Sequence, residues 1–327
     1  MTDPRSLSQW REVVDAFAGA STVALATHVN PDGDAIGSLL AASLALRSLG
    51  KETFASWGES PLEVPETYAF LPGVDTLLQP EDVPQVDLFV ALDCGAADRL
   101  GALEDAVVSA PRSVNIDHHP GNDGFATINI VVEDASSTAE IVTRLLEDLG
   151  APMTREVATC LYTGIVTDTG RFQYANTTPE VLRLAADLLA RGVPAPQVAQ
   201  EVFESAPFGY LKLTGVVLDR ARLHEEERFV YSWVTRDDLS SSGVESNETD
   251  KLVDLVRATR SADVAAIFKE RPDGTWRVSL RSKGPRSVGA IARAHGGGGH
   301  ELAAGFTASD VRRAVDAILA GLAEQRE

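Results

Sequence analysis

Short apolar segments alternate with stretches of helical period through the first half of this 327-residue chain. The apolar segments read STVALAT, ETFASW, VDLFVALD, RSVNID and ATINIVV. Helical patterns lie between or after them, at 35–49, 138–150, 154–165 and 179–189. Gly50 and Gly150 follow two of these patterns at the position typical of a helix C-terminal cap. The alternation predicts an α/β domain built on a doubly wound, mostly parallel sheet.

A different pattern begins after RGVPAPQVAQEVFESAP, a stretch at 191–207 that contains three prolines. Three strand-like segments follow, RFVYSWVT, DVAAIFKE and TWRVSLRS, with helical patterns at 249–257 and 287–294. The length also favours two domains, because one domain commonly uses about 100–200 residues. The sequence therefore predicts an N-terminal α/β domain at 1–190, a linker at 191–222 and a smaller α+β domain at 223–327.

The composition is that of a globular protein, with 44% hydrophobic and 24% charged residues. No apolar stretch reaches the roughly 18 residues of a membrane span, and the N-terminus lacks a signal-peptide pattern. We therefore expect a cytoplasmic protein that makes no membrane contact. Cys94 and Cys160 lie far apart and have no CxxC companion, so we expect core packing rather than a disulfide or a zinc site.

The net charge of -19 argues against binding to long nucleic acid, because that affinity depends on neutralising phosphates with Lys and Arg. One stretch has the opposite charge. Residues 269–293 contain seven basic and two acidic residues, a local charge of +5. We expect any site for a small anion outside a metal centre to lie there.

Residues with metal-ligand chemistry end or interrupt four of the apolar segments. They are His28, Asp32 and Asp34 after the first strand, Asp93 after VDLFVAL, Asp117, His118 and His119 at RSVNIDHH, and Asp168 within LYTGIVTDTGRF. The loops beyond the carboxyl ends of parallel strands meet in one crevice of an open sheet. We therefore expect these side chains, distant in sequence, to lie close together.

Each of these residues also has an ordinary structural explanation. Asp32 and Asp34 fit a turn, Asp93 and Asp168 fit helix or turn caps, and SST at 136–138 fits a helix N-cap. These explanations do not account for four separate insertions of carboxylate or imidazole without Lys or Arg beside them. Clustered carboxylates repel each other unless they hold cations. Taken together, the residues favour a metal-binding site.

The order of these motifs resembles that of the DHH phosphoesterase superfamily. The resemblance covers His28-x-x-x-Asp32-x-Asp34, the strand ending at Asp93, Asp117-His118-His119 and Thr167-Asp168-Thr169-Gly170. Downstream, GGGGH at 296–300 followed by ELAAGF is similar to the signature of the DHH-associated C-terminal domain. By length and domain pairing, the chain is most similar to the branch of nanoRNases, pAp phosphatases and cyclic di-AMP phosphodiesterases. The resemblance implies an active site in the cleft between the two domains.

The resemblance also implies two sets of metal ligands. His28, Asp32 and Asp93 would hold one divalent ion, and Asp34, Asp93, His118 and Asp168 would hold the other, so that Asp93 bridges them. Mixed imidazole and carboxylate ligands suit Mn²⁺ or a similar ion better than Ca²⁺. The resemblance points to Mn²⁺, with Mg²⁺ or Co²⁺ as alternatives, and to a homodimer.

Roles in catalysis and substrate binding follow on the same basis. His119 is expected to contact a phosphate oxygen or to protonate the leaving alkoxide, and Asp117 to orient a ligand histidine. The substrate contacts are expected from the C-terminal domain, where Arg281 suits a bidentate phosphate grip. The remaining candidates are Gly297, Gly298, Gly299 and His300.

The expected activity is hydrolysis of short oligoribonucleotides, linear or cyclic dinucleotides such as pApA and cyclic di-AMP, or pAp to mononucleotides, by water activated between two metals. Three other functions remain open at this point. A family-II inorganic pyrophosphatase has similar N-terminal motifs, a RecJ-like exonuclease acts on single strands, and a nucleotide sensor would keep the fold without catalysis. The chain is short for the exonuclease, and the negative net charge disfavours it.

Overall fold

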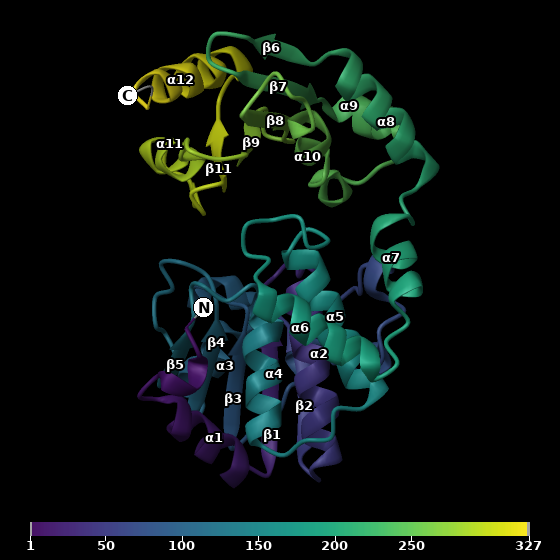
Figure 1. Cartoon of the computed structure of the whole chain (residues 1–327), viewed down its shortest axis with the longest axis vertical. Helices are drawn as coiled ribbons and strands as arrows, with labels where there is room; N and C mark the ends of the chain where they lie inside the picture. Colours follow the sequence, from purple (N-terminus) through teal and green to yellow (C-terminus); the bar gives the residue numbers. More distant parts are fainter. Residues whose placement is uncertain (1, 326–327) are drawn as a thin grey trace. The chain divides into compact units, whose positions relative to one another are not determined.

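The computed structural model describes residues 2–325, which form two compact units, the first ending at Ser205 and the second beginning at Ala206. The first unit contains a five-stranded sheet with helices on both faces (Figure 1). Its strands are β1 (Thr22–Thr27), β2 (Glu52–Trp57), β3 (Leu88–Leu92), β4 (Ser113–Asp117) and β5 (Ile128–Val131). Its α-helices are α1 (Trp10–Gly19), α2 (Gly33–Ser48), α3 (Glu104–Ser109), α4 (Thr138–Asp148), α5 (Arg155–Asp168), α6 (Pro179–Ala190) and α7 (Ala195–Phe203).

All strands of this first sheet run parallel, in the order β2-β1-β3-β4-β5. Alternate side chains of each strand point to opposite faces. On β1, Val23 and Leu25 join the larger core, which also contains residues of α1, α2, α4 and α5. Ala24 and Ala26 join the smaller core on the other face, under α3 and the 3-10 segment η5 (Ala97–Leu103). The predicted doubly wound parallel sheet is therefore confirmed.

Helices α2 and α5 pack closely together, and two glycines permit this. A Cβ at Gly37 of α2 would lie 2.5 Å from the backbone oxygen of Cys160 on α5. A Cβ at Gly164 of α5 would lie 2.8 Å from Oδ1 of Asp34 on α2. Both contacts are shorter than van der Waals distance, so only glycine fits at these positions without displacing its neighbours. The close packing brings the C-terminal end of α5 to the N-terminal end of α2.

The second unit contains a six-stranded mixed sheet in the order β10-β11-β9-β8-β7-β6. Its strands are β6 (Arg222–His224), β7 (Phe229–Val234), β8 (Val264–Glu270), β9 (Trp276–Ser282), β10 (Gly298–Gly299) and β11 (Ala303–Ala308). Its α-helices are α8 (Phe208–Asp219), α9 (Arg236–Ser242), α10 (Leu252–Arg257), α11 (Val288–Ala294) and α12 (Val311–Ala323). Neighbouring strands are antiparallel except for β7 and β8. Helices α11 and α12 pack on one face and α8 and α10 on the other, which confirms an α+β unit.

The segment at 191–222, expected to be a linker, contains helices α7 and α8. Val198 and Val202 of α7 belong to the core of the first unit, and Leu213 and Val217 of α8 belong to the second. The prolines that favoured a linker stand at the beginnings of these two helices, where the missing N–H costs no hydrogen bond. The boundary between the compact units therefore lies at 205/206, inside the expected linker.

The two cysteines are buried in the core, as the sequence predicted. Cys94 and Cys160 are both free thiols of the first unit. Burial raises the pKa of the Cys94 thiol to about 12, so this side chain stays protonated and apolar at neutral pH. Within residues 2–325, no helix combines the length and the apolar character needed to cross a bilayer.

Candidate metal centre and nucleotide-binding surface

The site residues of the first unit that the sequence predicted converge where the strands of the parallel sheet end. His28 directly follows β1, Asp93 follows β3, and Asp117 is the last residue of β4. Ligand atoms of three residue groups lie within 4.8 Å of one another: His28, Asp32 and Asp93; Asp34, His118 and Asp168; and Asp93, His118 and His119. The first group is the same as the first expected ligand set, and the second group contains the second expected set without Asp93. The third group also brings His119, which was expected to bind no metal, within reach of a cation.

Asp93 lies at the centre of these groups. Its Oδ1 is 3.7 Å from His118 Nε2 and 3.6 Å from His119 Nδ1, and its Oδ2 is 3.7 Å from His28 Nε2. The side chain is buried, and burial acts to raise its pKa. The interaction with His28 and the charges of His118 and His119 outweigh burial and lower the pKa of Asp93. Asp93 is therefore an anion between three imidazoles, placed to bridge two cations.

The backbone of Asp93 supports a functional role for this position. Its φ is +57°, in the left-handed region that non-glycine residues rarely adopt. Its N–H still donates to Ile116 O at 3.0 Å, so the strained residue is held by the adjoining β4 strand. Backbone strain of this kind costs about 1–3 kcal/mol and is concentrated at functional sites.

Asp34 faces the N-terminus of α4. The backbone N–H of Thr138 donates to its Oδ2 at 2.6 Å, and the N–H of Ala139 donates to its Oδ1 at 2.9 Å. A helix N-terminus stabilises an anion. Burial is the largest opposing effect, and together with repulsion from Asp93 and Asp168 it raises the pKa of Asp34 well above its usual range. Without a cation, the anionic form of Asp34 is therefore destabilised.

Asp168 is the last residue of α5, so the expectation that this helix ends at Ile165 was short by one turn. Its Oδ2 lies 3.5 Å from His118 Nε2. Burial and then the charges of Asp32 and Asp93 raise the pKa of Asp168 well above its usual range. A carboxylate at a helix C-terminus also meets the negative end of the helix dipole. All three effects would be relieved by a bound cation.

Asp32 is the N-cap of α2, as its position in a turn motif allowed. Its Oδ1 accepts from the N–H groups of Asp34 and Ala35 at 3.0 and 3.1 Å. The side chain is exposed, and its carboxylate also lies within the group formed with His28 and Asp93. The capping and ligand functions are compatible, because a carboxylate has two oxygens with several lone pairs.

Two histidines are held so that the same ring nitrogen faces the carboxylates. His28 Nδ1 lies 2.9 Å from Val29 O, and His118 Nδ1 lies 3.4 Å from Ala135 O. A carbonyl only accepts, so these bonds form when Nδ1 carries the proton, and in that neutral tautomer Nε2 keeps its lone pair. This arrangement, in which the second nitrogen donates to the backbone, is typical of metal-binding histidines.

His119 is held by Asp117 rather than by a backbone carbonyl. His119 Nδ1 donates to Asp117 Oδ1 at 2.8 Å, and Asn122 Nδ2 donates to Asp117 Oδ2 at 2.6 Å. Asp117 is fully buried, whereas the His119 side chain is 38% exposed. Burial acts to lower the pKa of His119, but the bond to Asp117 and the charge of Asp93 raise it to about 9. Asp117 thus orients His119, not the ligand histidine that the sequence had indicated.

Three supporting residues were missed at the sequence level. Thr138 Oγ1 donates to Asp93 Oδ1 at 3.0 Å, and Asn122 fixes Asp117 as described above. Arg99 Nη2 lies 3.0 Å from His28 Nδ1, although no basic residue was expected near the cluster. Arg99 can only donate, so its contact requires His28 Nδ1 without a proton and places the proton on Nε2. The bond to Val29 O requires the proton on Nδ1, which leaves Nε2 free for a cation. A signal for Arg99 was available, because it lies in η5, which follows Asp93 closely in the sequence.

The donor set fits divalent cations. Among residues 2–325, no Lys or Arg forms an ion pair with Asp32, Asp34, Asp93 or Asp168. The pKa values of Asp34 and Asp168 are raised, and Asp93 is held between imidazoles. Mixed imidazole and carboxylate ligands suit transition-metal ions such as Mn²⁺, whereas Ca²⁺ takes oxygen ligands alone.

The expected substrate contacts lie on neighbouring strands of the second unit. Arg281 of β9 pairs with Ala303 of β11, and Gly298 of β10 pairs with Gly305 on the other side of β11. Gly297 and Gly299 have a structural role, because a Cβ would lie 2.1 Å from Gly305 O and 2.6 Å from Ala303 O, respectively. A Cβ at Gly298 would meet nothing within 4 Å, so its surface is open. His300 directly follows β10 and is half-buried.

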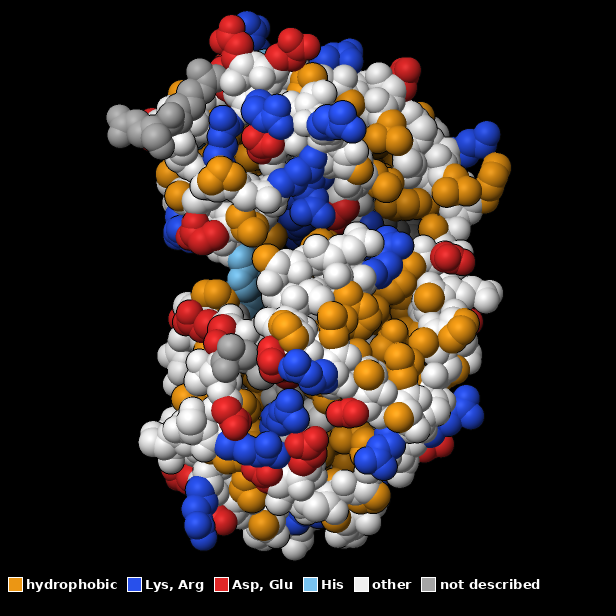
Figure 2. Space-filling model, in the orientation of Figure 1, with side chains coloured by type: hydrophobic (Ala, Val, Ile, Leu, Met, Phe, Trp, Pro, Cys, Tyr) orange, Lys and Arg blue, Asp and Glu red, His pale blue; other side chains and the backbone are white. Residues whose placement is uncertain are grey.

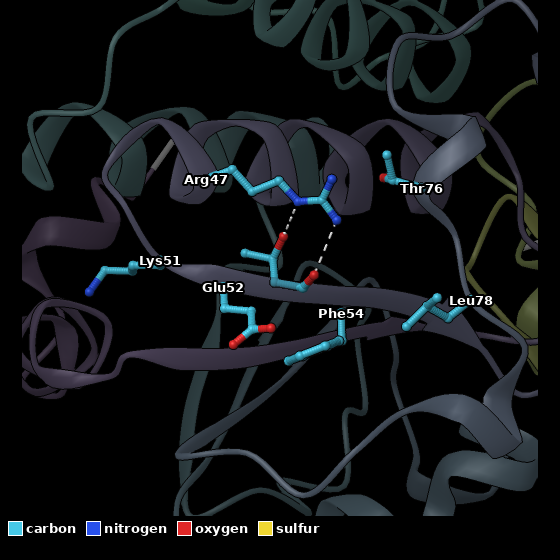
Figure 3. A pocket seen from close by; sticks show the side chains of 7 residues that line it. Arg47, Lys51, Glu52, Phe54, Thr76 and Leu78 are labelled. Carbon is cyan, nitrogen blue, oxygen red and sulfur yellow. Dashed lines mark hydrogen bonds between the residues drawn. The ribbon is translucent and has the colours of Figure 1, made fainter.

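A hollow of about 410 Å³ in the first unit lies away from these residues. It is lined by Arg47, Lys51, Glu52, Thr53, Phe54, Thr76 and Leu78 (Figure 3). The Arg47 guanidinium donates to Thr53 Oγ1 and Thr53 O, at 2.7 and 3.1 Å, and Lys51 Nζ donates to Ala20 O at 2.7 Å. The hollow lies where β2 begins, whereas the carboxylates follow the ends of parallel strands. Its lining carboxylate, Glu52, belongs to none of the three residue groups described above, so the hollow is not part of the candidate site.

Comparisons with known proteins agree with this geometry. Residues 22–165 match the family described as DHH family, N-terminal domain, and residues 226–325 match the DHHA1 domain. A protein of Thermus thermophilus named bifunctional oligoribonuclease and PAP phosphatase NrnA is 37% identical, over 99% of this chain and 96% of its own length. A protein of the same name from Bacillus subtilis is 29% identical, over 95% of this chain and 96% of its own.

The fold of the whole chain also has a solved counterpart. The crystal structure of an exopolyphosphatase-related protein from Bacteroides fragilis superposes with a TM-score of 0.88 at 26% sequence identity. The match covers 97% of this chain and 96% of the Bacteroides chain. Similarity to these proteins therefore extends over both units and is not confined to the metal-binding motifs.

Proposed function

Because the chain belongs to the DHH family and carries a DHHA1 domain, we propose that it is a phosphoesterase that hydrolyses short oligoribonucleotides and pAp to mononucleotides. The resemblance drawn from the motifs is thereby confirmed. The two similar proteins whose names state these activities align over nearly the whole chain, so both units have counterparts in them. Linear and cyclic dinucleotides such as pApA and cyclic di-AMP belong to the same substrate class.

One observation carries the proposal: Asp93 lies within 3.7 Å of three imidazoles, with two further carboxylates of raised pKa beside it. We propose that His28, Asp32 and Asp93 hold one divalent ion and that Asp34, Asp93, His118 and Asp168 hold a second. When bound, such ions polarise the phosphoryl group and supply a nucleophilic water at neutral pH. Mn²⁺ is the ion we propose, with Mg²⁺ or Co²⁺ as substitutes.

The protein's own groups have distinct tasks in this reaction. With its pKa raised to about 9, His119 is protonated at neutral pH and is partly exposed to solvent. It can therefore donate a proton to the leaving oxygen as the P–O bond breaks. Asp117 and Asn122 keep its ring in one orientation. Arg281, with Gly298 and His300 nearby on the sheet, supports binding of the nucleotide end of the substrate by the second unit.

Three finer properties are part of the same proposal. We expect the chain to act as a homodimer in the cytoplasm, on small nucleotides and short RNA rather than on long nucleic acid. The net charge of -19 supports the last point, because a phosphate backbone is repelled except where cations gather locally. Sedimentation of the purified chain tests the dimer directly.

An assay panel tests the activity. The purified chain, supplied with Mn²⁺, is offered pAp, pApA, cyclic di-AMP, a five-nucleotide RNA and pyrophosphate, and mononucleotide or phosphate release is measured. We expect turnover of the RNA, of pApA and of pAp, all of it lost when the metal is chelated. Turnover of pyrophosphate alone would assign the chain to the inorganic pyrophosphatases. Tight nucleotide binding with no turnover of any substrate would make it a sensor.

A further inference from the structure

One face of the second sheet carries a row of cations beside a glycine-containing edge. In the register of the sheet, Arg277 of β9 lies opposite Lys269 of β8, and Arg281 lies four residues further along β9. Alternate residues of a strand share a face, so Arg277 and Arg281 project to the same side. We call this surface the basic shelf, defined by Lys269, Arg277, Ser279, Arg281, Gly298 and Gly305.

The part of the shelf on β9, β10 and β11 is accessible within its own unit, whereas Lys269 on β8 is buried. Helices α11 and α12 pack on the opposite face of the sheet. The core under α8 and α10 contains residues of β7 and β8 but, in the described part of the chain, none of β9, β10 or β11. Arg277 and Gly298 are exposed, and the neighbouring Ser279 and Gly305 are half-buried. Figure 2 shows Lys and Arg side chains gathered over the middle of the second unit.

The positive charge of the shelf is only partly balanced. Lys269 is buried and forms an ion pair with Asp250. Among the residues that the structure describes, neither Arg277 nor Arg281 forms an ion pair, and Arg281 donates only to its neighbour's carbonyl, Leu280 O, at 3.0 Å. Like charges directly opposite each other destabilise a sheet. Burial lowers the pKa of Lys269, and the charges of Arg277 and Arg281 lower it further against the effect of Asp250. A bound anion would relieve this repulsion.

The spacing of the two arginines fits more than one phosphate. At about 3.3 Å per residue, the Cα atoms of Arg277 and Arg281 lie about 13 Å apart along the strand. Between them lies Ser279, followed across the sheet by Gly305 and then Gly298, so the floor on this side of β9 has almost no side-chain bulk. A sugar or base can lie on this floor while the two long side chains reach inward to phosphates at either side.

Resting on the proposed function, we infer that Arg277 is a second phosphate-binding residue, which holds an internucleotide phosphate beyond the phosphate held by Arg281. A substrate of several nucleotides supplies this additional phosphate, whereas pAp has both of its phosphates on a single nucleoside. Arg277 therefore favours oligonucleotides over pAp, and Arg281 serves both. A residue of the second unit thereby affects one activity of the metal centre, hydrolysis of oligonucleotides, more than the other, hydrolysis of pAp.

Steady-state kinetics of three charge-matched variants test this inference. Arg277→Gln, Arg281→Gln and Arg312→Gln each remove one positive charge, and Arg312 lies on α12, on the opposite face of the sheet. We expect Arg277→Gln to lower kcat/KM about tenfold for a 5′-phosphorylated five-nucleotide RNA and less than about twofold for pAp, since a charge-assisted contact to one phosphate is lost. Arg281→Gln should lower both, and Arg312→Gln neither. Equal losses for RNA and pAp in Arg277→Gln would overturn the inference.

Binding separates failure of this inference from failure of the proposed function. The affinity of the metal-stripped full chain for a fluorescein-labelled five-nucleotide RNA is measured by anisotropy across a salt series. We expect Arg277→Gln to bind about tenfold more weakly, with a salt slope reduced by about 0.7, the value for one phosphate contact on a single strand. This result would support the inference even if no substrate were hydrolysed. Unchanged affinity and slope, or no binding by the unaltered chain, would refute it.

Discussion

Asp168 illustrates how a single residue can lower stability and serve the site. Its half-buried carboxylate lies at a helix C-terminus near Asp32 and Asp93, and its pKa is raised. A carboxyl group whose pKa is raised on folding stabilises the fold only at low pH. Its contribution is complete below the unfolded-state pKa and is lost as the pH rises through the folded-state value. At neutral pH, the metal-free protein therefore carries the cost of this charge.

Replacing Asp168 by Asn should remove that cost. We predict that Asp168→Asn raises the melting temperature of the metal-free chain at pH 7 by about 2–4 °C, which corresponds to roughly 1 kcal/mol in a unit of about 200 residues. The gain should disappear near pH 4, and phosphoesterase activity should be lost. Differential scanning calorimetry with chelator present provides the measurement. A variant that is less stable at pH 7 would show that the carboxylate is stabilising without metal.

His119 and Asp117 make a second prediction at this scale. The protonated form of His119 is needed to donate to the leaving oxygen, so kcat should fall as the pH rises through the pKa of His119. That pKa is about 9 without metal, and bound cations lower it, so the basic limb should lie below 9. Asp117→Asn removes the carboxylate that raises this pKa and should shift the limb to lower pH. An identical basic limb in wild type and Asp117→Asn would exclude His119 as the acid.

At the scale of elements, the close packing of α2 and α5 determines the position of Asp34. Gly164→Ala places a Cβ 2.8 Å from both Asp34 Oδ1 and Ala139 Cβ. We predict a loss of about 1–3 kcal/mol in the free energy of unfolding, with a fall in kcat of tenfold or more as Asp34 is displaced. Urea unfolding and steady-state kinetics measure the two effects.

A matched control exists on another helix. Gly215 lies within α8, where an added Cβ would meet nothing within 4 Å. Gly215→Ala should stabilise the chain slightly, because alanine is a better helix former by about 1 kcal/mol, and should leave kcat unchanged. Full activity and stability in Gly164→Ala would show that the helices can separate without disturbing the site.

The elements best predicted from the sequence are those whose type and bounds depend on their own residues and not on pairing with distant segments. The strand ETFASW was placed at 52–57 and β2 spans the same residues, because its apolar character and flanking residues are local signals. The strands β10 and β11 were not expected, because GGGGHELAAGF contains four glycines and its pairing depends on β9, which lies elsewhere in the sequence. Helices α7 and α8 were taken for a linker, because prolines often separate helices. Here the prolines stand at the N-terminal ends of the two helices.

The site residues also fall into those that the sequence predicts and those that it does not. His28, Asp93 and His118 were predictable, because parallel topology brings strand ends together and the residue types indicate metal binding. Thr138 was not, because no local pattern connects the start of α4 with Asp93. Arg99 lies close to Asp93 in the sequence, but no local pattern shows that it contacts His28. Asp117 was expected to orient a ligand histidine and instead orients His119, since sequence cannot tell which ring turns toward a carboxylate.

In the whole molecule, the two units gather side chains of opposite charge. The first unit gathers carboxylates with few cations nearby, and the second unit carries the basic shelf on a chain with a net charge of -19. The first arrangement attracts cations and the second attracts phosphates.

We propose that the carboxylates and imidazoles around Asp93 hold two divalent ions that the activity requires. Titration of the metal-stripped chain with Mn²⁺, with hydrolysis of pApA followed at each addition, tests it most directly. We predict that activity rises from zero and saturates at two ions per chain, and that Asp93→Ala stays inactive while remaining folded by circular dichroism. Activity near that of wild type in Asp93→Ala, or full activity of the chain before any metal is added, would contradict the claim.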